Sequence, residues 1–247
     1  MIENLEINIA HLYPNLLNIF GDIGNINVLK SRLEWRNIKV NVDNILLNND
    51  IDFAKYDIYY IGGGCQDNEQ LMVANELQKY KCNFKSLADD GIVIFGVSAG
   101  YQLLCKYYQN KNGNKIDGLG IFDGYTVLGS ERLTGNVTVE TDFLTPNTLV
   151  GFENQNGLTF LEKDVKNLGK VIVGNGNNKN DKTEGARYNN VFGTYLHGPI
   201  LPKNPAFCDY LLECAIKRKL NDNKFKLAEL NDEIENLTHK QLLKKAY

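Results

Sequence analysis

Histidine is scarce in this sequence: its 247 residues include only three, His11, His197 and His239. Any mechanism that uses an imidazole therefore has few candidates. A single histidine is more often a structural group than a functional one. We expect His11, in the first apolar segment, in the core or at a strand edge, and His239, in a polar terminal segment, in solvent.

Paired cysteines and long apolar runs are also lacking. The five cysteines form no Cys-x-x-Cys pair, which favours reduced thiols in the cytoplasm over a disulfide framework or a zinc site. No apolar run reaches the ~20 residues that cross a bilayer. The first residues, MIENLEINIAHLYP, lack a basic segment followed by an apolar core. We therefore expect a cytoplasmic protein with no metal site, membrane insertion or secretory signal.

An excess of basic residues is absent as well. The formal net charge is −3, which gives no electrostatic reason to expect a nucleic-acid partner. The chain is 43% hydrophobic and 23% charged, so it can bury a large core in one α/β domain or in a domain with a subdomain.

The first half of the chain alternates between strand and helix patterns. Strands are expected near residues 5–13, 38–42, 56–64 and 91–95, and helices at 25–37, at 67–90 as one long amphipathic helix, and at 101–109. This alternation predicts a three-layer α/β fold in which helices cover both faces of a mostly parallel sheet.

From about residue 121 the pattern changes to short strands separated by turns, which indicates an antiparallel extension. A helix is expected to begin near Pro205, with further amphipathic helix in the last thirty residues. The chain is predicted to be one domain, 1–247. Its parts are a mainly parallel βαβ region (1–120), the antiparallel extension with the strand before His197 (121–200), and C-terminal helices (201–247).

The stretch GVSAGYQ at 96–102 follows the apolar run GIVIF. A Gly-x-Ser-x-Gly turn between strand and helix can raise the serine to the edge of a parallel sheet, where it can act as a nucleophile. Ser98 is therefore a candidate nucleophile. The alternative is a helix N-cap, a common role for serine at such a junction.

Two further features fall at strand ends, where doubly wound sheets place their chemistry. Gly62, Gly63 and Gly64 follow a buried strand and could direct backbone N–H groups at an oxyanion, or could form a plain tight loop. His197, in VFGTYLHGP, ends an apolar strand and could serve as a base for Ser98, or could be a structural histidine.

Seven segments, taken together and in this order, extend the analysis along nearly the whole chain: HLYPNLLNIFGDIGN, RLEWRNIKV, IGGGCQDNEQ, GVSAGYQLL, ERLTGN, GFENQNGLTFL and GTYLHGPILPKNP. The set resembles the GatD-type, CobB/CobQ-like branch of the class I glutamine amidotransferases. The resemblance implies their flavodoxin-like fold and a glutaminase activity.

Site residues follow from the resemblance. The family nucleophile is a cysteine that falls on Ser98, and the general base falls on His197. Gly63, Gly64 and the N–H of Ala99 are implied to form the oxyanion hole. Arg132, of the Arg-Leu-x-Gly segment, and Gln102 are implied to bind glutamine. The alternative for Arg132 is a surface arginine paired with Glu131 or Asp142.

Partners also follow from the resemblance. Family members act with a Mur-ligase-like, ATP-dependent subunit of the MurT type, which receives ammonia and amidates a peptidoglycan precursor, lipid II, that is bound to the membrane. L-Glutamine is the implied substrate. No cofactor is expected in this chain, and ATP and Mg²⁺ are expected in the partner.

Serine at position 98 leaves the activity open. A thiol beside a histidine at a helix N-terminus ionises near neutral pH, whereas an alcohol does not. Ser98 could be an engineered replacement for cysteine, a natural residue that lowers or removes activity, or a working serine nucleophile. The function is accordingly an active glutaminase subunit, a catalytically silent subunit that binds its partner, or a Ser-His hydrolase.

Overall fold

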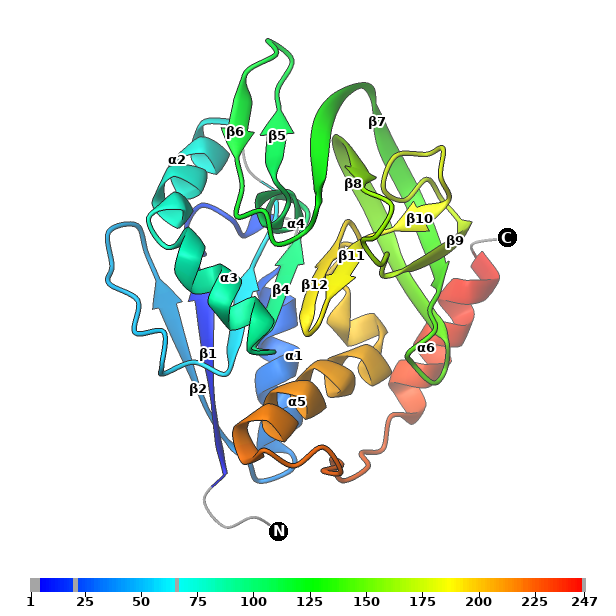
Figure 1. Cartoon of the computed structure of the whole chain (residues 1–247). Helices are drawn as coiled ribbons and strands as arrows, with labels where there is room; N and C mark the ends of the chain where they lie inside the picture. Colours follow the sequence, from blue (N-terminus) through cyan, green and yellow to red (C-terminus); the bar gives the residue numbers. More distant parts are fainter. Residues whose placement is uncertain (1–4, 20–21, 65–66, 246–247) are drawn as a thin grey trace.

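The computed structural model describes residues 5–19, 22–64 and 67–245. Two sheets organise the chain, and the first contains six strands in the order β11-β12-β4-β3-β1-β2 (Figure 1). All neighbours in this sheet are parallel except β11 and β12. Its strands are β1 (Glu6–Leu12), β2 (Lys39–Ile45), β3 (Ile58–Ile61), β4 (Val93–Val97), β11 (Ala186–Tyr188) and β12 (Val191–Thr194).

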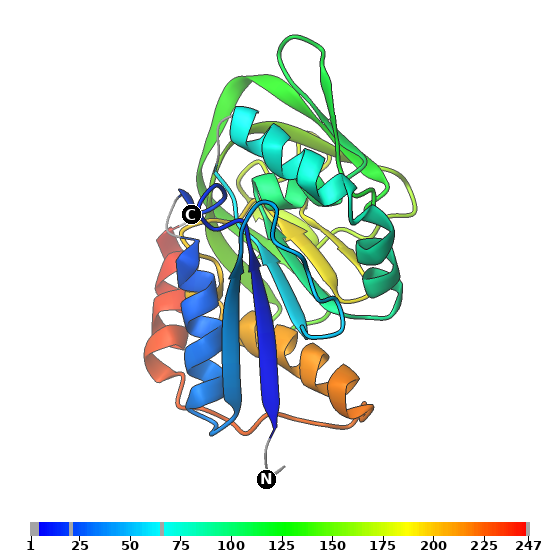
Figure 2. The same ribbon diagram turned by 90° about the vertical axis from the view of Figure 1, so that its left-hand side faces the viewer.

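Helices cover both faces of this sheet (Figure 2). The apolar side chains that alternate along β1, β3 and β4 separate into two buried clusters, because successive residues of a strand face opposite sides. One cluster packs against α1 (Ile23–Glu34) and α5 (Pro205–Leu220), and the other against α2 (Asp67–Gln78), α3 (Lys81–Asp89) and α4 (Ala99–Leu104). The predicted three-layer α/β architecture is confirmed.

The second sheet has the order β10-β9-β7-β5-β6, and β8 also pairs with β7. Its long central hairpin is formed by β7 (Gly124–Glu140) and β8 (Thr148–Leu161). The remaining strands are β5 (Tyr107–Gln109), β6 (Lys115–Asp117), β9 (Gly169–Val173) and β10 (Thr183–Glu184). This sheet is the predicted antiparallel extension, although β5 and β7 pair in parallel.

Three expectations from the sequence were wrong in detail. The segment before His197 does not belong to the antiparallel extension, because β12 pairs in parallel with β4 at the centre of the first sheet. The expected long helix 67–90 is two helices, α2 and α3, separated at Lys79 and Tyr80, whose N–H groups close tight turns on Glu76 and Leu77. Residues 101–109 are not one helix, since α4 ends at Leu104 and β5 begins at Tyr107.

The C-terminal part differs in a fourth way. The helix expected near Pro205 is α5, but the last thirty residues contain a segment without regular secondary structure before α6 (Glu233–Lys245). His239 on α6 is buried, with 4% of its surface exposed, where solvent exposure was expected. Its two ring nitrogens lie 2.9 Å from the Thr148 hydroxyl and 3.0 Å from the Lys203 carbonyl oxygen, so His239 attaches α6 to the body.

No helix in the described part of the chain is long and apolar enough to cross a membrane.

Candidate active site

Ser98 occupies the turn between β4 and α4 in a backbone conformation that is rare for a residue with a side chain, φ 53° and ψ −108°. Such strain is typical of a nucleophile elbow. Ser98 occupies the N-cap position of α4, as the alternative expected, but its side chain makes no capping hydrogen bond to the helix. The Ser98 amide donates to the Thr194 carbonyl oxygen at 2.8 Å, which ties the elbow to β12.

Close backbone contacts around the elbow explain two of its glycines. A Cβ on Gly63 would lie 2.5 Å from the Ser98 Cβ, and one on Gly100 would lie 2.2 Å from the Ile61 carbonyl oxygen. Real Cβ atoms do not approach so closely, so only glycine fits. The Gly100 amide in turn donates to the Gly62 carbonyl oxygen at 3.1 Å. The glycine-rich loop thus packs directly against the elbow.

The amide of Gly63 does not fit its predicted role in an oxyanion hole. It donates to a carboxylate oxygen of Asp22 at 2.9 Å. An N–H engaged in that way is not available to an oxyanion. Of the predicted donors, Gly64 and Ala99 line a cavity next to Ser98. Ala99 is the first residue of α4, and N–H groups in the first turn of a helix have no partner within it. Cys65 lies outside the described residues.

His197 follows β12 and lies next to the strand that carries the elbow. Thr194 pairs with Val97 across the two strands, so Ser98 and His197 both lie just beyond the carboxyl ends of neighbouring parallel strands. His197 is 2% exposed and does not line the cavity next to Ser98. Its backbone pairs with Phe152 on β8, which joins it to the second sheet. Direct contact between the Ser98 hydroxyl and the His197 ring stays a prediction.

Asp22 is a candidate residue that the sequence analysis missed. Its side chain is fully buried; one carboxylate oxygen accepts the Gly63 amide, and the other lies 3.7 Å from Nδ1 of His197. That separation is longer than a hydrogen bond but within ion-pair distance. Asp22 therefore lies next to Nδ1 of His197, the position that the buried acid of a catalytic triad takes beside its histidine. The sequence offered only a weak signal for it, an acidic residue in the loop after the first strand.

The third histidine, His11, lies in the same interior but has a structural role. It is fully buried, and its ring centre is 5.3 Å from that of Tyr60. Burial lowers the pKa of His11 to about 4, although the negative charge of Asp22 and the side chain of Asn44 favour the protonated ring. His11 is therefore neutral near pH 7, in accord with the expected place in the core.

The cavity next to Ser98 has a volume of about 150 Å³ and a mainly polar wall. Arg132 and Gln102 both line it. The Arg132 guanidinium donates to the Asn154 side-chain oxygen and is exposed. The alternative pairing of Arg132 is wrong, because Glu131 pairs with Lys179 and Asp142 with Arg187. The described residues that line it are Gly64, Gln70, Ser98, Ala99, Gln102, Tyr108, Leu128, Arg132, Asn154, Gln155, Asn156 and Gly157.

Gln102 is held by neighbouring side chains at both ends of its amide. Its oxygen accepts from Gln70 on α2 at 2.8 Å, and its nitrogen donates to the Tyr195 hydroxyl at 3.2 Å. The Tyr195 hydroxyl lies 2.6 Å from that of Thr159 on β8. These bonds make Gln102 part of a buried network that joins the two sheets along the cavity wall.

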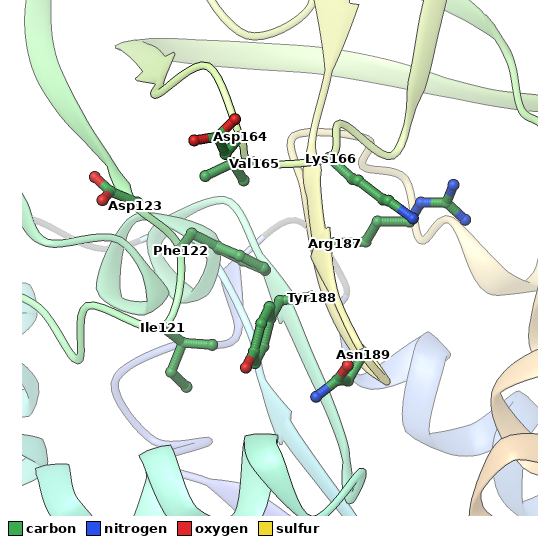
Figure 3. Close-up of a pocket in the computed structure, with 9 residues that line it drawn as sticks. All are labelled: Ile121, Phe122, Asp123, Asp164, Val165, Lys166, Arg187, Tyr188 and Asn189. Carbon is green, nitrogen blue, oxygen red and sulfur yellow. The ribbon is translucent and has the colours of Figure 1, made fainter.

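A larger cavity, of about 520 Å³, lies between the loop before β7 and the β11–β12 hairpin (Figure 3). None of the predicted site residues lines it. Its Arg187 donates to both carboxylate oxygens of Asp142, and its Tyr188 donates to Asp89. Both contacts tie the cavity wall to the rest of the fold, and because no predicted site residue lines this cavity we assign it no role.

Two buried carboxylates, Glu184 and Glu153, accept hydrogen bonds from segments near the site. Glu184, 1% exposed, accepts from the Thr194 hydroxyl and the Tyr195 amide, both at 2.7 Å. Glu153, also 1% exposed, accepts the amides of Asn175 and Gly176. Burial raises the pKa of Glu153 above its ordinary value and that of Glu184 to about 7.

A pH-dependent stability follows for Glu184. Folding raises the pKa of Glu184 from 4.5 to about 7, so the folded protein holds its proton more tightly than the unfolded chain. The contribution of Glu184 to the free energy of unfolding is therefore fully present below pH 4.5 and is lost as the pH rises through 7. We expect Glu184→Gln to gain about 2 kcal/mol in free energy of unfolding, relative to the unmodified chain, between pH 5 and pH 8. Urea unfolding at both pH values measures this, with the exposed Glu162→Gln as control. A constant difference between the two proteins would contradict it.

Known proteins with similar sequences are glutamine amidotransferases. The sequence model of the CobB/CobQ-like glutamine amidotransferase domain family matches residues 8–205 of this chain. The lipid II isoglutaminyl synthase (glutamine-hydrolyzing) subunit GatD of Staphylococcus aureus is 45% identical over 238 residues, covering 96% of this chain and 95% of the relative. The subunit of the same name from Streptococcus pneumoniae is 41% identical over 215 residues, covering 87% and 82%.

A solved structure gives the same fold. PurLQS of Thermotoga maritima aligns with a TM-score of 0.56 at 17% identity, covering 88% of this chain and 99% of that one. An α/β fold with a nucleophile elbow, and a family match over most of its length, lead to one conclusion: the chain belongs to the CobB/CobQ-like glutamine amidotransferases.

Proposed function

We propose that this chain is the glutaminase subunit of an enzyme that amidates a glutamate carboxylate of a lipid-linked peptidoglycan precursor. The observation that carries the proposal is the strained elbow at Ser98, which lies beside a polar cavity lined by Arg132 and at the same sheet edge as His197 and Asp22. The two relatives named as subunits of lipid II isoglutaminyl synthase, each similar over most of its length, support the acceptor.

The first step is the binding of glutamine. A guanidinium offers two parallel N–H groups to a carboxylate, and Arg132 at the exposed mouth of the cavity presents one. With its α-carboxylate there, the substrate extends toward Ser98 and brings its side-chain amide to the elbow. The Gln102 amide, fixed by Gln70 and Tyr195, forms a rigid wall for this cavity.

The second step is attack on the amide carbon. The side-chain oxygen of Ser98 forms the new bond as His197 removes its proton, and the charge on the carbonyl oxygen develops near the N–H groups of Ala99 and Gly64. The protonated His197 returns the proton to the leaving nitrogen, which departs as ammonia. Water then attacks the glutamyl ester by the same route and releases glutamate. Asp22 stabilises the positively charged imidazole in each half.

The third element is a partner subunit. Ammonia reacts with a carboxylate only when that carboxylate is activated, and we propose a Mur-ligase-like, MurT-type partner that activates the acceptor carboxylate with ATP and Mg²⁺. This chain itself would need no cofactor. A cytoplasmic location, on the side where such precursors are assembled, is part of the same proposal.

A catalytically silent subunit is the second candidate, and Ser98 is the observation that favours it. A serine needs concerted deprotonation, whereas a cysteine at a helix N-terminus is already largely ionised. Glutaminase assays on this chain and on Ser98→Cys, each with and without the partner, separate the readings. Activity only after the substitution supports the silent subunit, and activity in both supports the working serine. Hydrolysis of simple esters without glutamine hydrolysis supports the Ser-His hydrolase.

The role of Arg132 has its own test. In the Ser98→Cys background, with the partner present, Arg132→Ala should lower kcat/KM for glutamine by at least ~2 kcal/mol, about 30-fold, the scale of a lost charged hydrogen bond. Lys179→Ala is the matched control, since Lys179 is a nearby exposed cation that pairs with Glu131 and does not line the cavity. An unchanged kcat/KM would assign Arg132 to structure.

A further inference from the structure

Thr194 lies at the junction between the two halves of the candidate site. It is the last residue of β12 and is fully buried. Its carbonyl oxygen accepts the amide of Ser98 at 2.8 Å, so it fixes the start of the elbow. Its hydroxyl oxygen accepts the amide of Leu196 at 3.0 Å, so it also shapes the turn that leads to His197. One residue therefore contacts both the nucleophile segment and the histidine segment.

The direction of the Thr194 hydrogen bonds requires an acceptor nearby. A hydroxyl has a single proton, and because its oxygen already accepts the Leu196 N–H, that proton is free to be donated elsewhere. It is donated to Glu184, whose carboxylate oxygen lies 2.7 Å away. The same oxygen accepts the Tyr195 amide at 2.7 Å. Glu184 thus binds two successive residues of the segment that carries His197.

Glu184 is a costly residue to place there for packing alone. It is 1% exposed, and its second oxygen is buried without a hydrogen-bond partner among the described residues. An acidic group so placed costs stability, and Glu153, the other buried acid behind the site, adds repulsion. An apolar side chain would cost less but could not accept two hydrogen bonds. The Glu184 carboxylate therefore fixes the position of the Thr194–Tyr195 segment.

We propose that Glu184 and Thr194 form a positioning pair that sets His197 relative to the nucleophile at position 98. The proposal rests on the proposed function, in which residue 98 and His197 act together. Neither residue of the pair touches substrate: Thr194 holds the elbow through its carbonyl and the histidine turn through its hydroxyl, and Glu184 fixes the hydroxyl. Loss of the pair is expected to separate the two catalytic groups without unfolding the sheet.

The test uses the reactivity of a thiol at position 98, which reports the placement of His197 without any turnover. In Ser98→Cys, a histidine close to the thiol promotes the thiolate, so the alkylation rate at pH 7 reports their proximity. Iodoacetamide labelling of the full-length protein, resolved by peptide mass, separates position 98 from the natural cysteines. His197→Ala in this background gives the rate without the base.

Glu184→Ala and Thr194→Val should each lower the alkylation rate at position 98 at least tenfold at pH 7, toward the rate of His197→Ala. Glu184→Gln and Thr194→Ser, which retain the acceptor oxygen and the hydroxyl, should keep the parental rate within about threefold. Circular dichroism and urea unfolding identify any variant that fails to fold, and in that case the disruptive substitution at the other residue of the pair decides the result.

Parental rates in folded Glu184→Ala and Thr194→Val would overturn the positioning pair. So would equal losses in the conservative and disruptive variants, because a purely structural role does not distinguish them. A different result would overturn the proposed function instead: if His197→Ala itself leaves the thiol as reactive as in Ser98→Cys, residue 98 and His197 do not act together.

Discussion

Replacing Ser98 with cysteine is expected to raise the rate of glutamine hydrolysis at least ~10³-fold, a change comparable to restoring a disabled nucleophile. The elbow places residue 98 at the N-terminus of α4, where the peptide dipoles of the helix stabilise an anion. A thiolate benefits from that environment before the reaction begins, whereas a serine must lose its proton during the attack. Release of glutamate and ammonia by the full-length chain with its partner measures the gain.

Ser98→Ala is the control for this comparison, because it removes the nucleophile and gives the background rate. The unmodified chain should lie far below Ser98→Cys. Equal rates for Ser98→Cys and the unmodified chain would show that the site does not favour a thiol. A rate for the unmodified chain well above that of Ser98→Ala would identify serine as a working nucleophile.

Asp22→Asn is expected to lower kcat/KM at least ~10²-fold in the Ser98→Cys background, since an amide in place of the acid behind a catalytic histidine removes the charge that stabilises the imidazolium. The substitution is nearly isosteric. The asparagine oxygen can still accept the Gly63 amide, so the glycine-rich loop keeps its support. The change falls on the atom that lies 3.7 Å from Nδ1 of His197.

The matched control for Asp22 is Asp142→Asn, which removes a largely exposed carboxylate that pairs with Arg187 and does not line the cavity next to Ser98. That variant should retain kcat/KM within about twofold, with unchanged stability. If Asp22→Asn also stayed within twofold while folded, Asp22 would be a structural acceptor for Gly63 alone, and His197 would act as a dyad with residue 98.

Local patterns were sufficient to predict the parallel sheet and the elbow. Alternating apolar strands and amphipathic helices identify βαβ units, and a Gly-x-Ser-x-Gly turn between an apolar strand and a helix is typical of a nucleophile elbow. The break between α2 and α3 was not predictable, because Lys79 and Tyr80 are ordinary helix residues. The break follows from packing, which turns Phe84 and Leu87 of α3 toward the sheet.

The features of the site that were not predicted depend on contacts between segments far apart in the sequence. Asp22 meets His197 only because β1 and β12 end at the same edge of one sheet, and nothing local to either residue indicates that contact. The sequence favours the Gly63 amide as an oxyanion donor, but in the fold this amide donates to the Asp22 carboxylate. His239 lies in a polar segment, yet packing of α6 against Thr148 buries it.

The central claim is that residue 98 attacks the side-chain carbonyl of glutamine. Its most direct test is covalent labelling of Ser98→Cys by a chloroketone analogue of glutamine, followed by peptide mass analysis. We predict one adduct per chain, at position 98, which excess L-glutamine prevents and His197→Ala slows at least tenfold. Labelling that spreads over the natural cysteines, or that L-glutamine does not prevent, would contradict the account.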